Sequence, residues 1–565
     1  MIWQVSPAPD QEITNRLMSD LGVDHSIASL LAQRGIHSFE EAKAFFRPQL
    51  KQLHDPMLMA DMPEAVARIK EAFDKKESIM VFGDYDVDGT TAVSLMASYL
   101  KSKTELVTTY IPDRYTEGYG LSFQGIDVAA QNGITLMVVL DCGVKAIEKV
   151  TYAKEKGVDV IICDHHNPGE RLPDAIAVLD PKRSDCNYPF KELCGCGVGF
   201  KLIQAITETE GEKIETLLHY LDLVAVAVGA DIVPMIDENR VMTYFGLRQI
   251  NNNPRPGLKA LMSGFDLKDF CNSDVVFKIA PRINAAGRMV HGNFAVDLLM
   301  AENDEQTIKM AEQIEVFNTD RRALDQQITE EALTQILEND EIKHYSTVVY
   351  DPNWLKGVIG IVASRLTETH YRPTVVFTKS GEHLVASARS VKGFDLYSTL
   401  EACSDTIVQF GGHKYAAGLT IKADQYDAFK ACFEAEVKAR ISETQRIPSI
   451  QIDFEIQLSD ITPKFFRILK QFEPFGPNNM TPVFMSSAVS DSGFGKAVGS
   501  NAEHLRLAVK QDQSIVPAIG FGLGNKLPLI QNHAVFDIVY TVDLNEWNGQ
   551  SNLQLKLRDL RQTLT

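Results

Sequence analysis

The chain has 565 residues, of which 45% are hydrophobic and 23% charged, and its formal net charge at pH 7 is −19. These values exclude an intrinsically disordered chain, a collagen-like chain and a small disulfide scaffold, and the length suggests roughly three to five domains. The acidic balance argues against an indiscriminate polycation or a binder of membrane surfaces. It leaves room for a nucleic-acid enzyme whose charge is unevenly distributed.

The cysteines and the apolar segments bear on the compartment. The eight cysteines are scattered and form no Cys-x-x-Cys pair, which is typical of a reducing cytosol. The first residues lack the basic and apolar regions of a signal peptide. The most apolar stretch, residues 221–236, is interrupted by Asp222 and Asp231, so no transmembrane helix is expected. We therefore expect a cytoplasmic protein that is not bound to membranes.

An N-terminal helical segment, residues 1–75, precedes the first chemically informative region. Ser38 and Glu41 form a capping box that opens one of its helices. From residue 76 to 300, apolar runs first alternate with helical patterns, which predicts an α/β domain with a parallel sheet covered on both faces. The expected strands are 79–82, 106–111, 135–140, 158–163 and 176–179, and the expected helices between them are 90–100, 123–132 and 144–156.

The rest of the chain divides into three further segments. Residues 301–343 are expected to form a long, charged helical linker that bridges two lobes. Residues 344–445 repeat the strand and helix pattern and predict a smaller α/β domain. Residues 446–565 alternate apolar with polar positions at 450–458 and 553–557, and Asn548-Gly549 is a hairpin signal. This period predicts a small antiparallel β domain, either a barrel or a sandwich.

The sharpest chemical feature is the sequence Asp84-Tyr85-Asp86-Val87-Asp88-Gly89. It resembles the start of an EF-hand calcium loop, but the twelfth position, which needs Glu, is Leu95, and an expected strand precedes the motif instead of a helix. Two readings remain. The three carboxylates form either a solvated acidic turn or part of a site in which a divalent cation offsets their mutual repulsion.

Acidic residues also follow other apolar runs. Asp141 follows residues 135–140, Asp164-His165-His166 follows residues 158–163, and Asp231 follows the apolar stretch 223–229. Each Asp alone is equally well explained as a helix N-cap. Because parallel strands end at one edge of a sheet, the coincidence favours a shared site, and its oxygen and imidazole donors suit Mn²⁺ or Mg²⁺. The donors suffice for two ions that share a carboxylate, an arrangement that hydrolyses phosphoesters.

The motifs resemble a known superfamily. Asp164-His165-His166 is the motif that names the DHH phosphoesterases, and the other acidic motifs resemble the remaining metal motifs of that superfamily in the same order. Residues 281–289, Pro-Arg-Ile-Asn-Ala-Ala-Gly-Arg-Met, and residues 411–418, Gly-Gly-His-Lys-Tyr-Ala-Ala-Gly, resemble its RecJ family. The resemblance covers roughly residues 78–420, and the β tail resembles an OB-fold. It implies a 5′→3′ exonuclease that releases mononucleotides from single-stranded DNA in recombination and repair, through a channel too narrow for duplex DNA.

The resemblance also implies roles for individual residues. The expected metal ligands, which are also catalytic, are Asp86, Asp88, Asp141, His165 and Asp231. Asp141 is expected to bridge the two ions, and Asp84 either binds a metal or supports a ligand that does. His166 is a ligand, a substrate contact or a proton donor, and we favour the substrate contact. Asp164 is expected to orient the histidines.

A second set of residues is implied to hold DNA. Arg114, Ser387 and Arg389 are expected to form a pocket for the 5′ phosphate, although a single Arg is more often a surface ion pair. Gly411 and Gly412 with His413 are expected to approach phosphates, unless they form a packing turn. Arg282 and Arg288 flank an expected short turn and line the channel. The family often has Trp-His where this chain has Trp354-Leu355-Lys356, so we expect Lys356 to contact phosphate in place of that histidine.

Two other functions compete with the exonuclease. One is a DHH phosphatase for short oligonucleotides or cyclic dinucleotides, whose members usually lack a β tail. The other is a scaffold of the eukaryotic replicative helicase, against which the complete set of Asp and His residues argues. The resemblance implies single-strand-binding protein and a RecQ-type helicase as partners, and a monomeric state.

Overall fold

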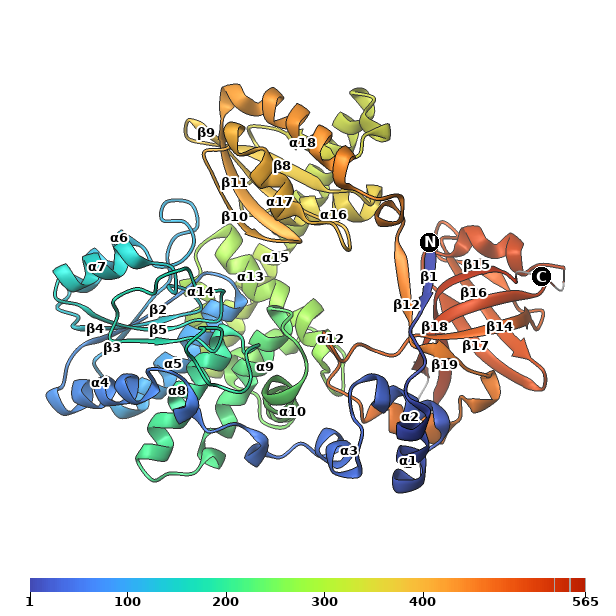
Figure 1. Cartoon of the computed structure of the whole chain (residues 1–565), viewed down its shortest axis with the longest axis horizontal. Helices are drawn as coiled ribbons and strands as arrows, with labels where there is room; N and C mark the ends of the chain where they lie inside the picture. Colours follow the sequence, from blue (N-terminus) through green and yellow to red (C-terminus); the bar gives the residue numbers. More distant parts are fainter. Residues whose placement is uncertain (533, 548–549, 564–565) are drawn as a thin grey trace. The chain divides into compact units, whose positions relative to one another are not determined.

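The computed structural model describes residues 1–532, 534–547 and 550–563, with the side chains of 546, 547 and 550 left out. Contacts divide the chain into two compact units (Figure 1). Unit 1 contains residues 1–53, 234–244 and 449–565, and unit 2 contains residues 54–233 and 245–448. Residues 1–53 thus group with the C-terminal region, which the sequence did not predict. Within the described part of the chain, no helix is both long and apolar enough to cross a membrane.

Unit 2 begins with a five-stranded, fully parallel sheet, as the sequence predicted. Its order is β3-β2-β4-β5-β6, with strands β2 (Ile79–Gly83), β3 (Val107–Tyr110), β4 (Leu136–Leu140), β5 (Asp159–Cys163) and β6 (Ala177–Leu179). β2 and β4 are buried at every position, which explains their unbroken apolar sequences. The register pairs Gly83 with Leu140 and Leu140 with Cys163. The residues that follow these three strands therefore meet at one edge.

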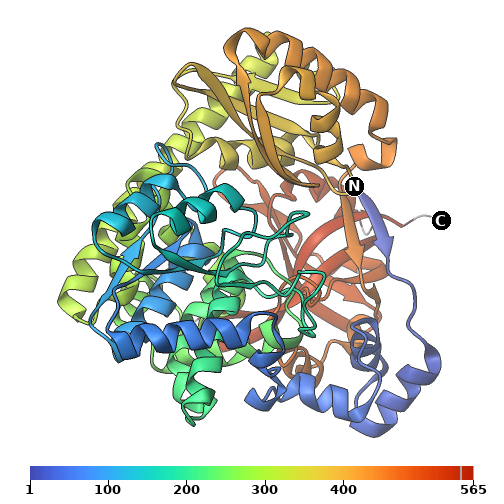
Figure 2. The ribbon, with the colours of Figure 1, turned by 60° about the vertical axis from the view of Figure 1, so that its left-hand side comes forward.

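Helices cover both faces of this sheet (Figure 2). They are α4 (Met62–Lys75), α5 (Val87–Lys103), α6 (Phe123–Gln131), α7 (Ile147–Glu155) and α8 (Gly195–Thr209). α6 and α7 pack on one face through a cluster that includes Phe82, Ile126, Val139 and Val150, whereas α4, α5 and α8 lie on the other face. This three-layer arrangement confirms the fold class predicted for the region.

A helical region follows the sheet. It consists of α9 (Leu221–Ala230), α10 (Asp237–Asn252), α11 (Pro256–Met262), α12 (Asn272–Asp274), α13 (Ala280–Met289), α14 (Asn293–Met300) and α15 (Asp304–Glu338). The long charged linker is indeed one helix, α15. Two local expectations were wrong. The apolar stretch 223–229, grouped with the strand ends, is the helix α9, because a short apolar run does not distinguish a buried helix from a strand. Arg282 and Arg288 do not flank a turn but lie in α13.

Unit 2 ends with a second, smaller α/β region. Its sheet has the order β10-β11-β9-β8-β7, with β7 (Thr347–Tyr350), β8 (Thr374–Ser380), β9 (His383–Arg389), β10 (Gln409–His413) and β11 (Ala416–Lys422). β7 and β8 are parallel and the other neighbours are antiparallel. α16 (Ile359–His370) and α15 cover one face, and α17 (Leu396–Ala402) and α18 (Tyr426–Arg440) cover the other.

Unit 1 contains a closed β barrel and a set of helices. The barrel strands are β13 (Phe454–Glu455), β14 (Phe484–Asp491), β15 (Lys496–Val498), β16 (His504–Gln511), β17 (Ser514–Gly520), β18 (Phe536–Trp547) and β19 (Gln550–Gln562). Their order, β13-β14-β18-β19-β17-β16-β15, closes through an additional β14–β16 pairing, so the predicted β domain is a barrel with OB-like strand order. The expected hairpin turn at Asn548-Gly549 lies outside the described residues.

The helices of unit 1 are α1 (Gln11–Leu21), α2 (His25–Gln33), α3 (Phe39–Phe46) and α19 (Pro463–Lys470). α3 begins at the predicted Ser38–Glu41 capping box. A strand in the N-terminal segment was not predicted: β1 (Ile2–Val5) pairs in parallel with β12 (Ser449–Ile452), outside the barrel. The partner of so short a strand lies at the other end of the sequence, where local periodicity gives no information about it.

Candidate functional site

Three short segments at the carboxyl edge of the first sheet carry most of the expected metal ligands. Asp84 follows β2, and Asp86 caps α5 by accepting a hydrogen bond from the Gly89 N–H at 3.0 Å. Asp88 lies in the first turn of α5, where it accepts hydrogen bonds from the N–H groups of Gly195 and Cys196 at 2.6 and 2.8 Å. A Cβ at Gly89 would lie 2.4 Å from the Asp84 carbonyl oxygen, so this tight turn requires glycine.

The other ligands approach from β4, β5 and α9. Asp141 follows β4 in a left-handed conformation with φ of 59°, and its N–H donates to the Cys163 carbonyl at 2.9 Å. His165 follows β5, and Asp231 ends α9. The His165 Nε2 lies 3.2 Å from Asp141 Oδ1, 3.6 Å from Asp231 Oδ2 and 3.8 Å from Asp88 Oδ2. The edge of the sheet and one helix end thus place three carboxylates around one imidazole.

Two sets of three residues bring ligand atoms close enough for a metal ion. They are Asp141, His165 and His166, and Asp88, His165 and Asp231, each with all ligand atoms within 4.8 Å of one another. His165 belongs to both sets, whereas Asp141, the expected bridge, belongs to one. Asp84 and Asp86 lie in neither set, although the charges of both raise the pKa of Asp141.

The buried carboxylates of this centre repel one another, and this repulsion favours the binding of a cation. Burial and the neighbouring carboxylates raise the pKa of Asp84 and Asp141 well above the usual range, that of Asp88 to about 6 and that of Asp231 to about 8. Burial lowers the pKa of His165 to about 3, which leaves its imidazole neutral and able to ligate. A divalent cation would relieve this repulsion, and oxygen with imidazole donors fits Mn²⁺ or Mg²⁺. The residues present therefore fit the expected metals.

Asp164 holds the two histidines, as the sequence suggested. Its Oδ1 accepts hydrogen bonds from the His165 and His166 N–H groups at 2.7 and 3.1 Å and lies 2.7 Å from His166 Nδ1, while Oδ2 accepts from the Val144 N–H at 2.9 Å. Although burial opposes it, the hydrogen bond with His166 lowers the pKa of Asp164 to about 2. Despite burial, the same bond raises the pKa of His166 to about 9.

Sequence reasoning missed two residues at this edge. The Tyr119 hydroxyl lies 3.2 Å from His166 Nε2, and its loop also donates the Gly120 N–H to Asp84 at 3.3 Å. Asp180 follows β6 as the other acids follow their strands. Its Oδ2 is buried with no partner among the residues that the structure describes, and burial raises its pKa to about 7. Asp180 could have been predicted in the same way as the other acidic residues, because it directly follows residues 176–179, which were expected to form a strand. No local signal indicates the contact of Tyr119.

A pocket of about 560 Å³ in unit 2 collects most of the expected phosphate contacts. Its lining includes Tyr85, Arg114, Tyr119, Arg288, Lys356, Ser387, Arg389 and Gly411. The Arg114 guanidinium lies 3.8 Å from the centre of the Tyr85 ring, and Arg389 Nη1 donates to Ser387 Oγ at 3.0 Å. Burial, together with the charges of Arg114 and other arginines, lowers the pKa of Arg288 to about 9. These unneutralised guanidinium groups favour an anion.

Three expected DNA contacts are not among the residues that line this pocket. Arg282 is held elsewhere: its Nε lies 2.6 Å from Glu315 Oε2, and its guanidinium packs on Phe265. Gly412 and His413 belong to β10, where Gly412 has φ of 146° and the His413 Nδ1 accepts a hydrogen bond from the Tyr415 N–H at 3.2 Å. The segment 411–418 thus lies in the β hairpin that β10 and β11 form.

Family models and curated proteins match most of this chain. The model of the DHH family, N-terminal domain, matches residues 78–228, that of the DHHA1 domain matches residues 343–439, and that of the RecJ OB domain matches residues 452–559. Over 564 residues the chain is 36% identical to the single-stranded-DNA-specific exonuclease RecJ of Bacillus subtilis, which covers 99% of this chain and 70% of that protein. It is 31% identical to the RecJ exonuclease of Haemophilus influenzae, with 90% of this chain and 91% of that protein covered.

A solved structure gives the same result. The crystal structure of RecJ from Thermus thermophilus in complex with Mn²⁺ matches with a TM-score of 0.86 at 26% identity, covering 100% of this chain and 80% of that one. Extensive sequence identity, three matched domain models and a shared fold therefore lead to one conclusion. The chain belongs to the RecJ family of exonucleases within the DHH superfamily.

Proposed function

We propose that the chain is a metal-dependent exonuclease that hydrolyses single-stranded DNA from its 5′ end to mononucleotides. The observation that carries this proposal is the connection between the metal centre and the cationic pocket. Tyr119 lines the pocket and also contacts His166 through its hydroxyl. A strand whose 5′ phosphate binds Arg114 and Arg389 would thus present an early phosphodiester to the carboxylates, which accounts for both the polarity and the short product.

The proposed centre uses Mn²⁺ or Mg²⁺ in two sites, and these ions supply hydroxide and stabilise charge on the phosphate. The chain holds them with Asp84, Asp86, Asp88, Asp141, His165 and Asp231. Asp164 holds the imidazole of His166 and the backbone N–H of His165, and His166 contacts the substrate. Arg114, Arg288, Ser387 and Arg389 hold the 5′ phosphate, with Lys356 beside them. Gly411, Gly412, His413 and Arg282 remain proposed contacts for the strand beyond this pocket.

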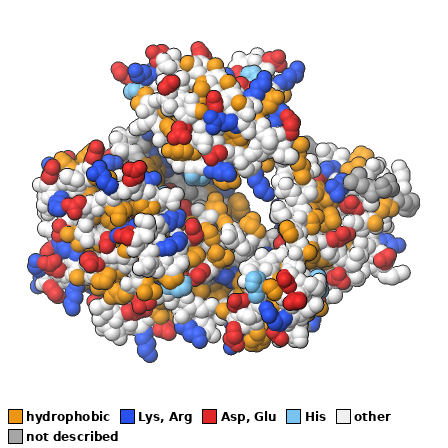
Figure 3. All heavy atoms as spheres, in the orientation of Figure 1, with side chains coloured by type: hydrophobic (Ala, Val, Ile, Leu, Met, Phe, Trp, Pro, Cys, Tyr) orange, Lys and Arg blue, Asp and Glu red, His pale blue; other side chains and the backbone are white. Residues whose placement is uncertain are grey.

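Affinity for the strand is expected to come from this pocket more than from the overall charge. On the face shown in Figure 3, acidic and basic side chains are interspersed. The chain as a whole is acidic, with 75 Asp and Glu residues against 56 Lys and Arg residues. A concentrated set of guanidinium groups in a pocket binds a terminal phosphate where a diffuse surface would not.

The alternative of a small-substrate DHH phosphatase has no comparable support. The β tail, residues 452–559, matches the RecJ OB domain model, and this is the segment that such phosphatases usually lack. We keep five segments as a proposal: 1–75, 76–300, 301–343, 344–445 and 446–565. Single-strand-binding protein and a RecQ-type helicase as partners, a monomeric state and a cytoplasmic location also stay predictions.

The test is a digestion with Mn²⁺ of a 5′-phosphorylated single strand labelled at either end. Its blunt duplex, its 5′-hydroxyl counterpart and a dinucleotide serve as comparisons. We expect mononucleotides from the 5′ end of the single strand, slower release from the 5′-hydroxyl strand and none from the duplex. Release from the 3′ end, or hydrolysis of the dinucleotide alone, would contradict the proposal.

A further inference from the structure

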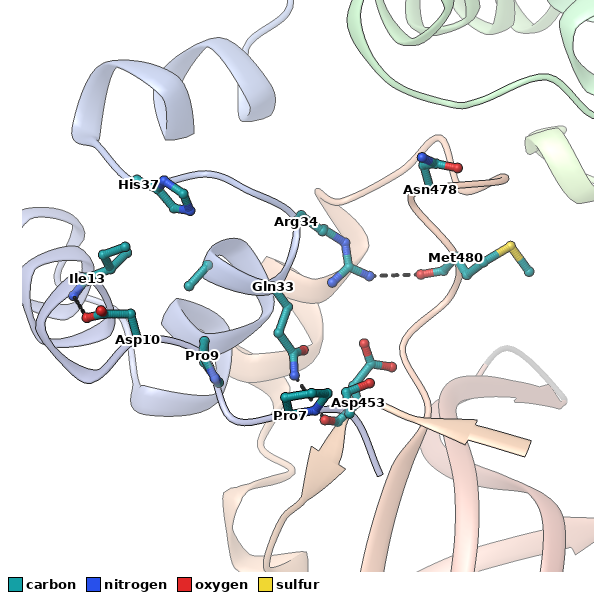
Figure 4. A pocket seen from close by; sticks show the side chains of 12 residues that line it. Pro7, Pro9, Asp10, Ile13, Gln33, Arg34, His37, Asp453, Asn478 and Met480 are labelled. Atoms are coloured by element: carbon teal, nitrogen blue, oxygen red, sulfur yellow. Dashed lines mark hydrogen bonds between the residues drawn. The ribbon is translucent and has the colours of Figure 1, made fainter. Parts of the chain in front are cut away.

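A second pocket, of about 510 Å³, lies within unit 1 and has no part in the chemistry described above. It lies where three segments meet (Figure 4): the N-terminal segment 6–13, the end of α2 with the residues after it, and the residues around Asp453 and Met480. All of its lining residues belong to unit 1, whereas the expected metal ligands belong to unit 2. The pocket therefore shares no residue with the expected metal centre.

The walls of this pocket are held by internal hydrogen bonds. Gln33 Nε2 donates to the Asp453 carbonyl at 3.0 Å. Arg34 is committed through all three guanidinium nitrogens, which donate to Asn479 Oδ1 at 2.8 Å, to the Leu30 carbonyl at 3.1 Å and to the Met480 carbonyl at 2.9 Å. The pocket is thus preformed, and the guanidinium nitrogens of its one arginine already donate to neutral oxygens of the wall, although the positive charge of Arg34 remains.

Some hydrogen-bond acceptors on the residues that line the pocket are left available to a ligand. The Asp453 Oδ2 accepts from the Val483 N–H at 2.8 Å, but its Oδ1 accepts from no other described residue. Asp10 is exposed and caps α1 through Oδ1, at 2.8 and 3.1 Å, while its Oδ2 accepts from no residue that the structure describes. The Gln33 Oε1 is buried and has no partner within the described part of the chain. Burial raises the pKa of Asp453 although Arg34 opposes this, so the nearby guanidinium does not fully compensate the carboxylate.

An apolar rim completes the pocket. Pro7, Pro9, Ile13 and Met480 line it beside the polar groups, and Figure 4 shows the Asp453 carboxylate and Gln33 between these walls. Such a rim suits the methylene stem of a long side chain, while the inner acceptors suit a head group that carries several N–H donors and a positive charge. A guanidinium has five N–H donors in a planar fork and no acceptor, so it can reach more of these acceptors at once than the three-donor ammonium of lysine.

We propose that this pocket binds an arginine side chain presented by a partner polypeptide. Asp453 accepts the guanidinium together with Gln33, and Asp10 adds negative charge from the opposite wall. A carboxylate or phosphate ligand is disfavoured, because it would face two carboxylates while the only guanidinium is already engaged. The site gives this acidic chain a docking point for a basic partner that shares no residue with the expected metal centre.

The test uses the full chain and three capped tripeptides, Ac-Gly-Arg-Gly-NH2 and its counterparts with citrulline or Glu at the centre. Binding is titrated by saturation-transfer difference NMR. Citrulline keeps the shape of arginine but has no charge, so we expect it to bind about tenfold more weakly, the effect of one charge-assisted hydrogen bond. Equal binding of the citrulline or Glu peptide, or no transfer to the Arg peptide, overturns the proposal.

Three variants locate the site. Asp453→Asn and Asp10→Asn remove one charge each, and Asn caps a helix as well as Asp does. Asp24→Asn is the matched control, because Asp24 caps α2 in the same way, accepting from the Ile27 N–H at 2.9 Å, but does not line the pocket. We expect Asp453→Asn and Asp10→Asn to bind the Arg peptide several-fold more weakly than the wild type does. Asp24→Asn should bind it with the wild-type affinity. An unchanged Tm by calorimetry verifies that each variant is folded, and equal weakening by Asp24→Asn overturns the assignment.

Discussion

Replacing Gly195 with Ala should disturb the expected metal centre, because Gly195 packs directly against Asp141. It is the first residue of α8, its N–H donates to Asp88, and its Cα faces Asp141. A Cβ at this position would lie 2.6 Å from Asp141 Cβ and 2.7 Å from both its Cα and its Oδ1. Ordinary carbon contacts begin near 3.5 Å, so Gly195→Ala forces a displacement of about 0.9 Å.

This displacement affects two of the proposed metal ligands, Asp88 and Asp141, at once. Positioning errors of about 1 Å in an active site cost roughly a hundredfold in rate, or about 2.7 kcal/mol of transition-state stabilisation. Overpacking costs about 1–3 kcal/mol of folding stability, which the better helix propensity of Ala partly offsets. We therefore expect kcat to fall about a hundredfold and Mn²⁺ to bind more weakly, while the protein remains folded.

The matched control lies two residues further along the same helix. A Cβ at Gly197 would meet its nearest atoms at 3.6 Å, an ordinary contact, so Gly197→Ala should leave kcat unchanged and slightly stabilise α8. The assay combines initial rates on a 5′-phosphorylated single strand, free Mn²⁺ by electron paramagnetic resonance and Tm by calorimetry. If Gly195→Ala keeps a rate within threefold of wild type, or Gly197→Ala loses as much, the reasoning is refuted.

Three further predictions follow from the site. Asp141→Asn should abolish hydrolysis but leave the Kd for single-stranded DNA, measured by fluorescence anisotropy, within a few-fold; activity near wild type would contradict the metal assignment. Arg389→Ala should raise KM about tenfold or more for a 5′-phosphorylated strand but not for a 5′-hydroxyl strand, because one charge-assisted contact is lost; an equal effect on both strands argues against a phosphate pocket. The raised pKa values of Asp88 and Asp231 mean that the metal-free protein loses stability as pH rises from about 4 to 8, since both carboxyls prefer protons in the folded state. The gain in Tm on adding Mn²⁺ should therefore grow over that range, and calorimetry showing a constant gain would contradict the electrostatics.

The sequence predicted that several acidic residues meet at one edge of the sheet, because that part of the site follows from topology. Parallel strands must end at a common edge, so Asp84, Asp141 and Asp164 are neighbours in any such sheet. Asp231 does lie 3.6 Å from His165, although it ends the helix α9 and not a strand. The apolar run before it is buried on all sides, and burial alone does not distinguish the two structures.

Other parts of the site depend on contacts that no local pattern encodes. Arg282 and Arg288 are six positions apart in α13, which turns their side chains about 120° away from each other. Only Arg288 therefore lines the pocket, whereas Arg282 pairs with Glu315. The contact of Tyr119 with His166 depends on the path of a loop between two segments. In the same way, β1 was missed because its partner β12 is distant in the sequence.

The two parts of the site, the carboxylates at the sheet edge and the arginines of the pocket, carry opposite charges. Within each part, like charges repel one another. The carboxylates at the sheet edge repel one another and any phosphate, as the raised pKa values of Asp88 and Asp231 express. The arginines of the pocket repel one another, as the lowered pKa of Arg288 expresses. We expect metal ions to relieve the first repulsion and a terminal phosphate to relieve the second. A strand without that phosphate would meet the acidic edge with less compensation, so in a chain of net charge −19 we expect the site to favour the phosphorylated 5′ end of DNA.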